Sequence, residues 1–193
     1  MNSREKILTA ITANKPALVN LPVMDLQQVT NYDDLVAKFT TTLESIGGQV
    51  LHLDNSSMLS SIINEEMQTD KLLLNAIDDL TGELKSSQVA SALEPVHKAF
   101  INASIGVAEN GAVWVKESQM INRLLPFICQ HLVIVLEKEK LVATMHHAYR
   151  QVNVFEEGFG VFIAGPSKTA DIEQSLVIGA HGARSMTVYL LDK

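Results

Sequence analysis

The spacing of hydrophobic residues predicts short helices and strands in the first half of the chain. Ile7, Leu8 and Ile11 recur at helical intervals and predict an amphipathic helix over Ser3–Ala13. After an extended connection over 14–32, helix and strand patterns alternate: a helix that starts after Asp33 and ends at Gly47-Gly48, a strand over Gln49–Leu53, a helix from Asp54 through Ile63, and a strand over Lys71–Ile77. This alternation is typical of an α/β sheet with parallel neighbours.

The second half contains one hairpin and then returns to alternation. Asn110-Gly111 separates two strand patterns, Phe100–Ala108 and Ala112–Lys116, and both turn residues tolerate positive φ. The later pattern predicts strands over His131–Leu136, Phe159–Ala164 and Met186–Leu191, and helices over Glu137–Tyr149 and Thr169–Ala180. We therefore predict a single α/β domain over residues 1–193, with a mostly parallel sheet, flanking helices and one β-hairpin. Right-handed crossovers predict that the three later strands are parallel neighbours.

Composition and charge narrow the possible functions. Hydrophobic residues make up 47% of the chain and charged residues 19%, as in soluble globular proteins. The net charge of −7 argues against a nucleic-acid or anionic-membrane partner. No apolar run is long enough for a membrane span, and the N-terminus lacks the apolar core of a signal peptide, so we expect a cytoplasmic protein.

The side chains that bind metals in proteins are sparse or badly spaced. The single cysteine, Cys129, excludes an internal disulfide and a cysteine-ligated iron–sulfur cluster built from this chain alone. The six histidines form no pair at metal-ligand spacing. We therefore expect neither a metal nor a cofactor of its own.

The segment Gly165–Gln174 concentrates polar residues after a predicted strand. It is not a Walker loop, because Pro166 interrupts the pattern and has no N–H for a phosphate. One interpretation is a well-capped helix N-terminus. The other is the wall of a ligand site at the carboxyl end of a strand, where open α/β sheets bind ligands. There the free N–H groups of a helix N-terminus, with Lys168, can hold a carboxylate or phosphate. The candidate ligand-binding residues are Gly165, Ser167, Lys168, Thr169, Asp171 and Glu173.

Two further positions have a structural and a functional interpretation. Glu109 precedes the Asn-Gly turn, either as a solvent-facing hairpin residue or as a carboxylate held for nucleophilic or general-base catalysis. Asn110 and Gly111 would then contact the ligand. His181 lies near the end of the predicted helix before Gly182, where it stabilises the helix C-terminus or joins the ligand site.

Several stretches of the second half resemble one known family. These are "GVAENGAVWV" at Gly106–Val115, "RLLPF" at Arg123–Phe127, His131 at the start of a strand, and the long run Phe162–Leu191 with its "GPSKTADIE" and "GAHG" segments. They resemble the LUD-domain family, most closely its lactate-utilisation protein C branch, from about Ile101 to Leu191. The resemblance implies a Rossmann-like α/β fold of the type found in sugar-phosphate isomerases and CoA-transferases.

The resemblance also implies a role in oxidising L-lactate to pyruvate beside cysteine-rich and iron–sulfur partner proteins. A chain with one cysteine fits the non-cluster subunit of such a system, with a small carboxylate or phosphate as its ligand. Glu109-Asn110-Gly111 also resembles the Glu-Asn-Gly signature of CoA-transferases, whose glutamate forms an acyl-enzyme thioester. Two alternatives therefore stay open: a stand-alone enzyme acting on a carboxylate or acyl-CoA through Glu109, and a non-catalytic ligand-binding regulatory module.

Overall fold

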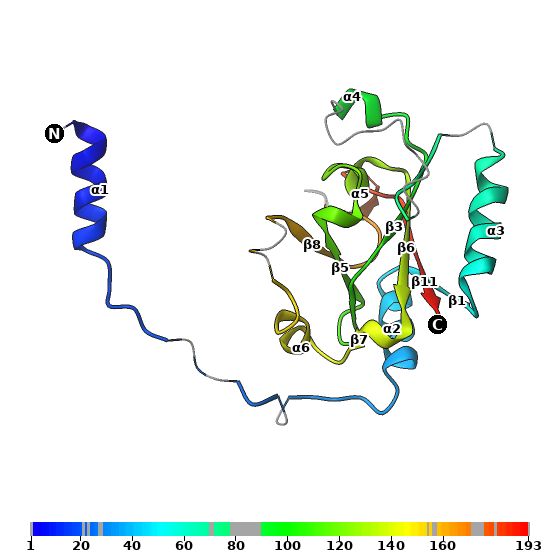
Figure 1. The fold of residues 1–193 in the computed structure, drawn as a ribbon, viewed down its shortest axis with the longest axis horizontal. Helices are drawn as coiled ribbons and strands as arrows, with labels where there is room; N and C mark the ends of the chain where they lie inside the picture. Colours follow the sequence, from blue (N-terminus) through cyan, green and yellow to red (C-terminus); the bar gives the residue numbers. More distant parts are fainter. Residues whose placement is uncertain are drawn as a thin grey trace.

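The computed structural model describes residues 2–20, 22, 24–26, 29–69, 72–77, 90–153, 155, 158–170, 176–179 and 181–192. It begins with α1 (Ser3–Ala13), which stands apart from the rest of the chain (Figure 1). The predicted helix is confirmed, although its N-cap is Asn2, which forms a capping box with Glu5. Every residue from 2 to 20 is exposed, so this arm makes no contribution to the core.

The centre of the molecule is a five-stranded sheet in which every neighbouring pair is parallel. Its order is β1 (Gln49–Leu53), β11 (Ser185–Leu191), β6 (His131–Glu137), β3 (Lys98–Asn102) and β2 (Leu73–Asn75). The predicted mostly parallel α/β sheet is confirmed, and β6 and β11 are parallel neighbours, as the crossover rule predicted.

Different elements cover the two faces of this sheet. On one face, α2 (Leu35–Ser45) inserts Phe39 and Leu43 into a core with Ile134 of β6 and Val188 of β11. On the other face, α3 (Ser56–Met67) packs Leu59 and Ile63 against the sheet. Both helices begin at short polar caps, at Asp34 for α2 and Asn55 for α3, where a side-chain oxygen accepts a backbone N–H.

A second sheet lies on the α2 side and shares its core. Its order is β7 (Leu141–Val142), β4 (Ile105–Val107), β5 (Ala112–Lys116) and β8 (Gly160–Ile163). The antiparallel pair β4–β5 confirms the predicted hairpin. The prediction that Val161–Ala164 pairs in parallel with β6 or β11 is wrong, because β8 pairs antiparallel with β5. The crossover rule applies to parallel strands of one sheet, and it does not show whether two successive strands belong to the same sheet.

Two predicted helices are wrong in the described residues. The segment predicted as a helix over Glu137–Tyr149 contains a 3₁₀ turn, η3 (Lys138–Lys140), the strand β7, and the short helix α6 (Met145–Tyr149). The two residues of β7 pair with β4, and those ladder hydrogen bonds replace helical ones.

The segment predicted as a helix over Thr169–Ala180 instead contains two antiparallel strands, β9 (Lys168–Ala170) and β10 (Leu176–Ile178). β-Branched residues favour strands over helix, and they occur in both strands: Thr169 in β9, and Val177 and Ile178 in β10. Gly179, at φ 78°, ends β10. His181 therefore caps no helix C-terminus.

The remaining elements are short. They are α4 (Ala90–Leu93), the 3₁₀ turn η2 (Glu117–Gln119) and α5 (Leu125–Ile128). The predicted strand over Phe100–Ala108 is divided into β3 and β4, because the chain crosses from the first sheet to the second at Ala103 and Ser104. No helix in the described part of the chain is long and apolar enough to cross a membrane.

Candidate functional site

The chain leaves the parallel sheet twice at its carboxyl edge to form parts of the second sheet. The chain leaves β3 at Asn102 to form the hairpin of the second sheet, and it leaves β6 at Glu137 to form β7. Both excursions start at neighbouring strand ends, because β3 and β6 pair directly. Ligands of open α/β sheets bind outside the carboxyl ends of the strands, in crevices that such departures open.

A pocket of about 490 Å³ lies at this edge, and we name it the carboxyl-edge pocket. Its lining comes from the ends of β3, β6 and β11 in the first sheet, from β4 and β5 in the second, and from the turns between them. The lining residues are Asn102, Ala103, Ser104, Ile105, Lys116, Gln119, Val135, Glu137, Lys140, Gln151 and Leu191. The pocket therefore sits where the two sheets meet.

Gln119 fixes one wall of this pocket. Its Oε1 accepts hydrogen bonds from the Ser104 hydroxyl at 2.9 Å and from the Lys116 backbone N–H at 3.0 Å. The crossing itself is tied to both sheets, since the Ala103 N–H donates to the Val135 carbonyl and the Ser104 N–H donates to the Trp114 carbonyl. A wall held by four such bonds keeps its shape when a ligand enters.

The charges of the carboxyl-edge pocket suit a small anion. Lys116 and Lys140 contribute two ammonium groups to the lining, against one carboxylate from Glu137. Asn102 and Gln151 add amide groups that can donate to an oxygen atom. Beside the pocket, Lys138 is paired with Asp192 at 2.7 Å. The arrangement can hold one carboxylate and hydrogen-bond a neighbouring hydroxyl or carbonyl oxygen.

Glu109, the predicted catalytic residue, serves as a cap in this fold. Its Oε1 accepts the backbone N–H of Met145 at 2.8 Å, at the start of α6, and its own N–H donates to the Ala143 carbonyl. The side chain is half-buried, and it does not line the carboxyl-edge pocket. The carboxylate thus links the hairpin turn to the segment after β7.

Asn110 and Gly111 build the same turn. The Asn110 side-chain oxygen accepts the Ala112 N–H at 3.0 Å. Gly111 has φ 69°, and a Cβ added there would lie 3.0 Å from the Cα of Leu43 in α2. The turn therefore requires glycine for its conformation and for the close approach of α2.

Four of the predicted ligand residues do lie together. Gly165, Ser167, Lys168 and His181 line a second pocket of about 300 Å³, which we name the loop pocket. Its other lining residues are Pro126, Phe127, Leu132, Phe162, Ile163, Ala164, Pro166, Gly182 and Ala183. Glu109 is not among them, so the structure does not bring it together with this loop in one pocket.

The loop pocket has no helix N-terminus in its described part. Ser167 instead donates its backbone N–H to the Ala183 carbonyl and accepts the Gly179 N–H at its own carbonyl. Thr169 belongs to β9, and Asp171 and Glu173 lie outside the described residues. Anion binding by free helical N–H groups, which the sequence predicted, therefore loses its basis, while Lys168 and His181 remain as two basic side chains.

The described residues contain no group of three or more His, Cys, Asp or Glu side chains that could hold a metal ion. Cys129 is buried at the end of α5, and this burial raises the pKa of its thiol to about 12. A thiol with that pKa is a poor nucleophile near neutral pH.

Sequence comparison shows the family to which the chain belongs. The model of the LUD domain matches residues 85–191, which is more than half of the chain. This protein is a member of the LUD-domain family. The matched region contains the hairpin, β6, the loop pocket and β11, together with the whole lining of the carboxyl-edge pocket.

Several curated relatives are named lactate utilization protein C. The protein from Oceanobacillus iheyensis is 31% identical over 114 residues, which are 56% of this chain and 48% of that protein. The protein from Bacillus pumilus is 35% identical over 92 residues, 45% of this chain and 38% of that protein. The chain thus spans about half the length of these relatives or less. The Macrococcus caseolyticus protein aligns over 98% of this chain and 83% of its own length, at 24% identity.

A solved structure supports the fold. The crystal structure of a DUF162 family protein from Deinococcus radiodurans superposes with a TM-score of 0.61 and covers 81% of this chain and 96% of that one. The sequence identity is 13%, so the likeness concerns the fold alone.

The residues that sequence reasoning missed are those of the carboxyl-edge pocket. Lys116 ends a predicted strand, Gln119 follows that strand, and Lys140 lies in the predicted helix over Glu137–Tyr149; none belongs to a recognisable motif. The available signal was the position of Lys116 and Gln119 at a strand end, which becomes informative only when the sheet order is known.

Proposed function

We propose that this LUD-domain protein acts in lactate utilisation as a carboxylate-binding subunit without a redox centre of its own. The names of its relatives support the metabolic role. Oxidation of L-lactate to pyruvate releases two electrons, so this chain would work beside partner proteins that carry the iron–sulfur centres. It would hold the small carboxylate, and the partners would take the electrons.

The observation that carries this proposal is the pair Lys116 and Lys140 in the carboxyl-edge pocket. Lactate and pyruvate each have one carboxylate and one oxygen on the adjacent carbon. An ammonium group satisfies the carboxylate, and the amides of Asn102 and Gln151 satisfy the second oxygen. Glu137, on the same lining, disfavours ligands with more than one negative charge.

The loop pocket is the competing location for the same ligand. Lys168 and His181 line it, and the sequence alone favoured it. The two locations differ in which lysine the ligand needs. Isothermal titration with pyruvate and with L-lactate should be carried out on the parent chain, on Lys140→Ala and on Lys168→Ala.

We expect Lys140→Ala to weaken binding about tenfold or more, the effect of losing one charge-assisted hydrogen bond. Lys168→Ala should bind like the parent. The opposite result, loss in Lys168→Ala and none in Lys140→Ala, would move the ligand to the loop pocket. Parent-like binding in both variants would remove the carboxylate-binding proposal altogether.

The subunit role has its own test. The purified chain should be colourless and should reduce no dye in the presence of L-lactate, because the proposed role assigns the electron-accepting groups to the partners. Lactate-dependent dye reduction by the isolated, metal-free protein would contradict the role and would support a stand-alone enzyme.

The alternative of catalysis through Glu109 rests on a half-buried carboxylate held at the Met145 N–H. Glu109→Gln keeps a side-chain oxygen for that bond and removes the nucleophile. If acyl-CoA turnover exists in the parent and vanishes in this variant while the melting temperature is kept, the stand-alone enzyme is the correct function. A non-catalytic regulatory module would bind pyruvate and change the activity of its partners, but it would turn over neither L-lactate nor an acyl-CoA.

A further inference from the structure

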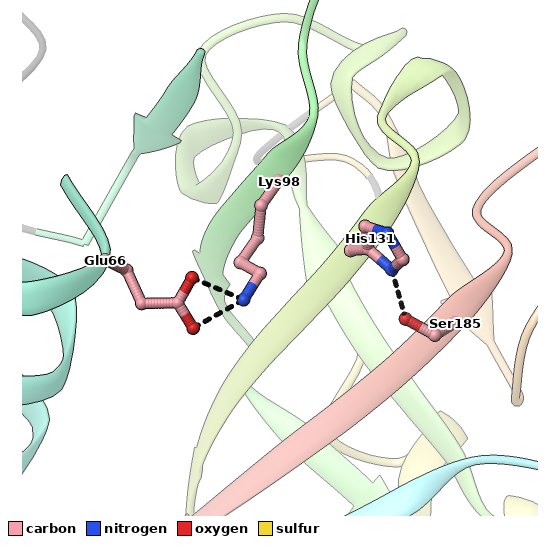
Figure 2. A network of polar contacts seen from close by, with 4 residues as sticks. All are labelled: Glu66, Lys98, His131 and Ser185. Carbon is pink, nitrogen blue, oxygen red and sulfur yellow. Dashed lines mark hydrogen bonds and ion pairs between the residues drawn. The ribbon is translucent and has the colours of Figure 1, made fainter. Parts of the chain in front are cut away.

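A row of polar side chains crosses the three central strands of the parallel sheet at their amino ends. Lys98 of β3 lies in register with His131 of β6, and His131 lies in register with Ser185 of β11. Figure 2 shows these three residues on neighbouring strands, with Glu66 reaching Lys98 from α3. Central strands of a parallel sheet usually carry apolar residues on both faces. This row departs from that pattern and serves neither pocket described above.

The row is accessible because α3 covers only part of its face of the sheet. Leu59 and Ile63 of α3 pack with residues further along the strands: Leu53, Phe100, Val133, Val135 and Tyr189. On the β1 side of the same face, Leu51, in register with Tyr189, is 49% exposed. A pocket of about 330 Å³ remains there, which we name the amino-end pocket. Its lining residues are Gln49, Leu51, His97, Lys98, His131, Leu132, Val133, Ser185, Thr187 and Tyr189.

The polar groups of this pocket are held in fixed positions. The Nδ1 atom of His131 lies 2.7 Å from the Ser185 hydroxyl oxygen, and the His97 ring packs edge-on against His131 with the centroids 4.7 Å apart. The Lys98 ammonium is hydrogen-bonded to both carboxylate oxygens of Glu66. Such fixed groups lose little conformational entropy when a ligand binds.

The charges of the lining select an anion. Three side chains of the pocket are basic, Lys98, His97 and His131, and none of its described lining residues carries a carboxylate. Hydroxyl groups of Ser185 and Thr187 and the amide of Gln49 surround them. Glu66 of α3, which pairs with Lys98, lies outside the lining. An oxyanion with several acceptor atoms matches this set of donors better than a single carboxylate does.

We propose that the amino-end pocket binds a phosphate group of a small molecule, at a site separate from the carboxyl-edge pocket. Histidine N–H groups and the Ser185 and Thr187 hydroxyls donate to the phosphate oxygens, and Lys98 supplies positive charge. Glu66 opposes this binding, because it neutralises Lys98 in the empty pocket. The ligand therefore competes with Glu66 for the same ammonium group.

Titration of the full chain with inorganic phosphate and with AMP, followed by calorimetry, tests this proposal. His131→Gln and Ser185→Ala should each weaken binding, His131→Gln by about tenfold because it removes a hydrogen-bond donor to a charged phosphate oxygen. Glu66→Gln should tighten binding several-fold, since it frees Lys98. Lys15→Ala, which removes an exposed lysine of the arm, is the matched control and should bind like the parent.

The Glu66→Gln variant separates a binding site from a solvated patch of the sheet. A merely structural Lys98–Glu66 pair predicts that its loss never improves phosphate binding. The proposal is overturned if neither ligand binds up to about 10 mM, or if His131→Gln and Ser185→Ala, with parent-like melting temperatures, bind as the parent does. Tighter binding of AMP than of phosphate identifies a nucleotide as the source of the phosphate group, and equal binding identifies the free ion.

Discussion

The carboxyl-edge pocket and the loop pocket are built in opposite ways. The first takes its lining from strand ends and turns scattered between Asn102 and Leu191, and hydrogen bonds to both sheets hold its crossing. The second takes seven lining residues from the single stretch Phe162–Lys168, and that stretch leads into the two-stranded pair β9–β10. The first pocket thus depends on strand ends from the whole fold, whereas the second takes just over half of its lining from one local segment.

This difference indicates which pocket holds its groups more rigidly. The walls of the carboxyl-edge pocket move only if the parallel sheet or its junction with the second sheet moves. The loop pocket can change with its own segment, because Lys168 lies in β9, and no described strand of the two larger sheets pairs with β9. Binding groups on rigid elements are positioned more accurately than groups on loops. The predictions below test this contrast.

The largest effect is expected from the core that supports the carboxyl-edge pocket. Leu136 is fully buried in β6 between two lining residues, Val135 and Glu137. Leu136→Ala should lower the free energy of unfolding by about 2–5 kcal/mol, because it leaves a cavity between the sheets. Leu124→Ala, at a side chain that is 42% exposed, is the control and should cost about 0.5 kcal/mol or less. Urea unfolding measures the free energy of unfolding of both variants. Equal losses would contradict a role of Leu136 in the core shared by the two sheets.

The next effect concerns the wall of the loop pocket, where Cys129 lies behind Pro126. Burial raises the pKa of its thiol to about 12, above the unfolded value. The folded state therefore gains stability below the unfolded pKa, and this stability is lost as the pH rises towards the folded pKa. Between about pH 8.5 and 10 the free energy of unfolding should fall by on the order of 2 kcal/mol.

Cys129→Ala is the variant that checks this alkaline effect. It should start from a lower stability, because a buried group is removed, and should lack the decline below about pH 10. Tyr189, whose pKa is raised by burial and by Glu66, would add to the loss only at higher pH. An unchanged decline in Cys129→Ala would show that another group causes it.

A smaller effect is expected at Gln119, which joins the two sides of the carboxyl-edge pocket. Gln119→Ala leaves the Ser104 hydroxyl and the Lys116 N–H without their acceptor and should cost about 1–2 kcal/mol. Gln119→Glu keeps an acceptor and should melt near the parent. Its new negative charge should nevertheless weaken pyruvate binding. Parent-like pyruvate affinity in Gln119→Glu would favour the loop pocket.

The smallest effect is expected at the rim. Lys138 and Asp192 form an ion pair at 2.7 Å beside the carboxyl-edge pocket, and both side chains are partly exposed to solvent. Lys138→Ala should lower stability by about 0.2–1 kcal/mol, and less at high salt. Thermal melting at low and high ionic strength measures this difference. A loss of several kcal/mol would show that the rim is part of the rigid core.

The sequence predicted the elements whose pattern is local. α1, β1, β6 and β11 occupy nearly the expected residues, and the Asn110-Gly111 turn joins β4 to β5. The sequence signals for these elements lie within a few residues of the elements themselves, so local spacing is enough to predict them. The prediction of one domain over residues 1–193 stays a prediction.

The failures have a common physical cause. β7, β8, β9 and β10 are short strands, and no local period identifies the strand with which each one pairs. The sequence did not predict the carboxyl-edge pocket for the same reason, because its lysines converge only after both sheets have formed. The loop residues Gly165, Ser167, Lys168 and His181 converge as expected, although without the helix that motivated the prediction.

Trp114 gives the second sheet an optical signal of its own. It is the single tryptophan of the chain, is buried, and packs on Phe162 with ring centroids 4.7 Å apart. Gly160 allows this fit, since a Cβ there would lie 2.3 Å from the indole ring. Indole emission therefore follows the β5–β8 pair, whereas far-ultraviolet circular dichroism follows the whole backbone. The two unfolding curves will superimpose only if the sheets unfold as one cooperative unit.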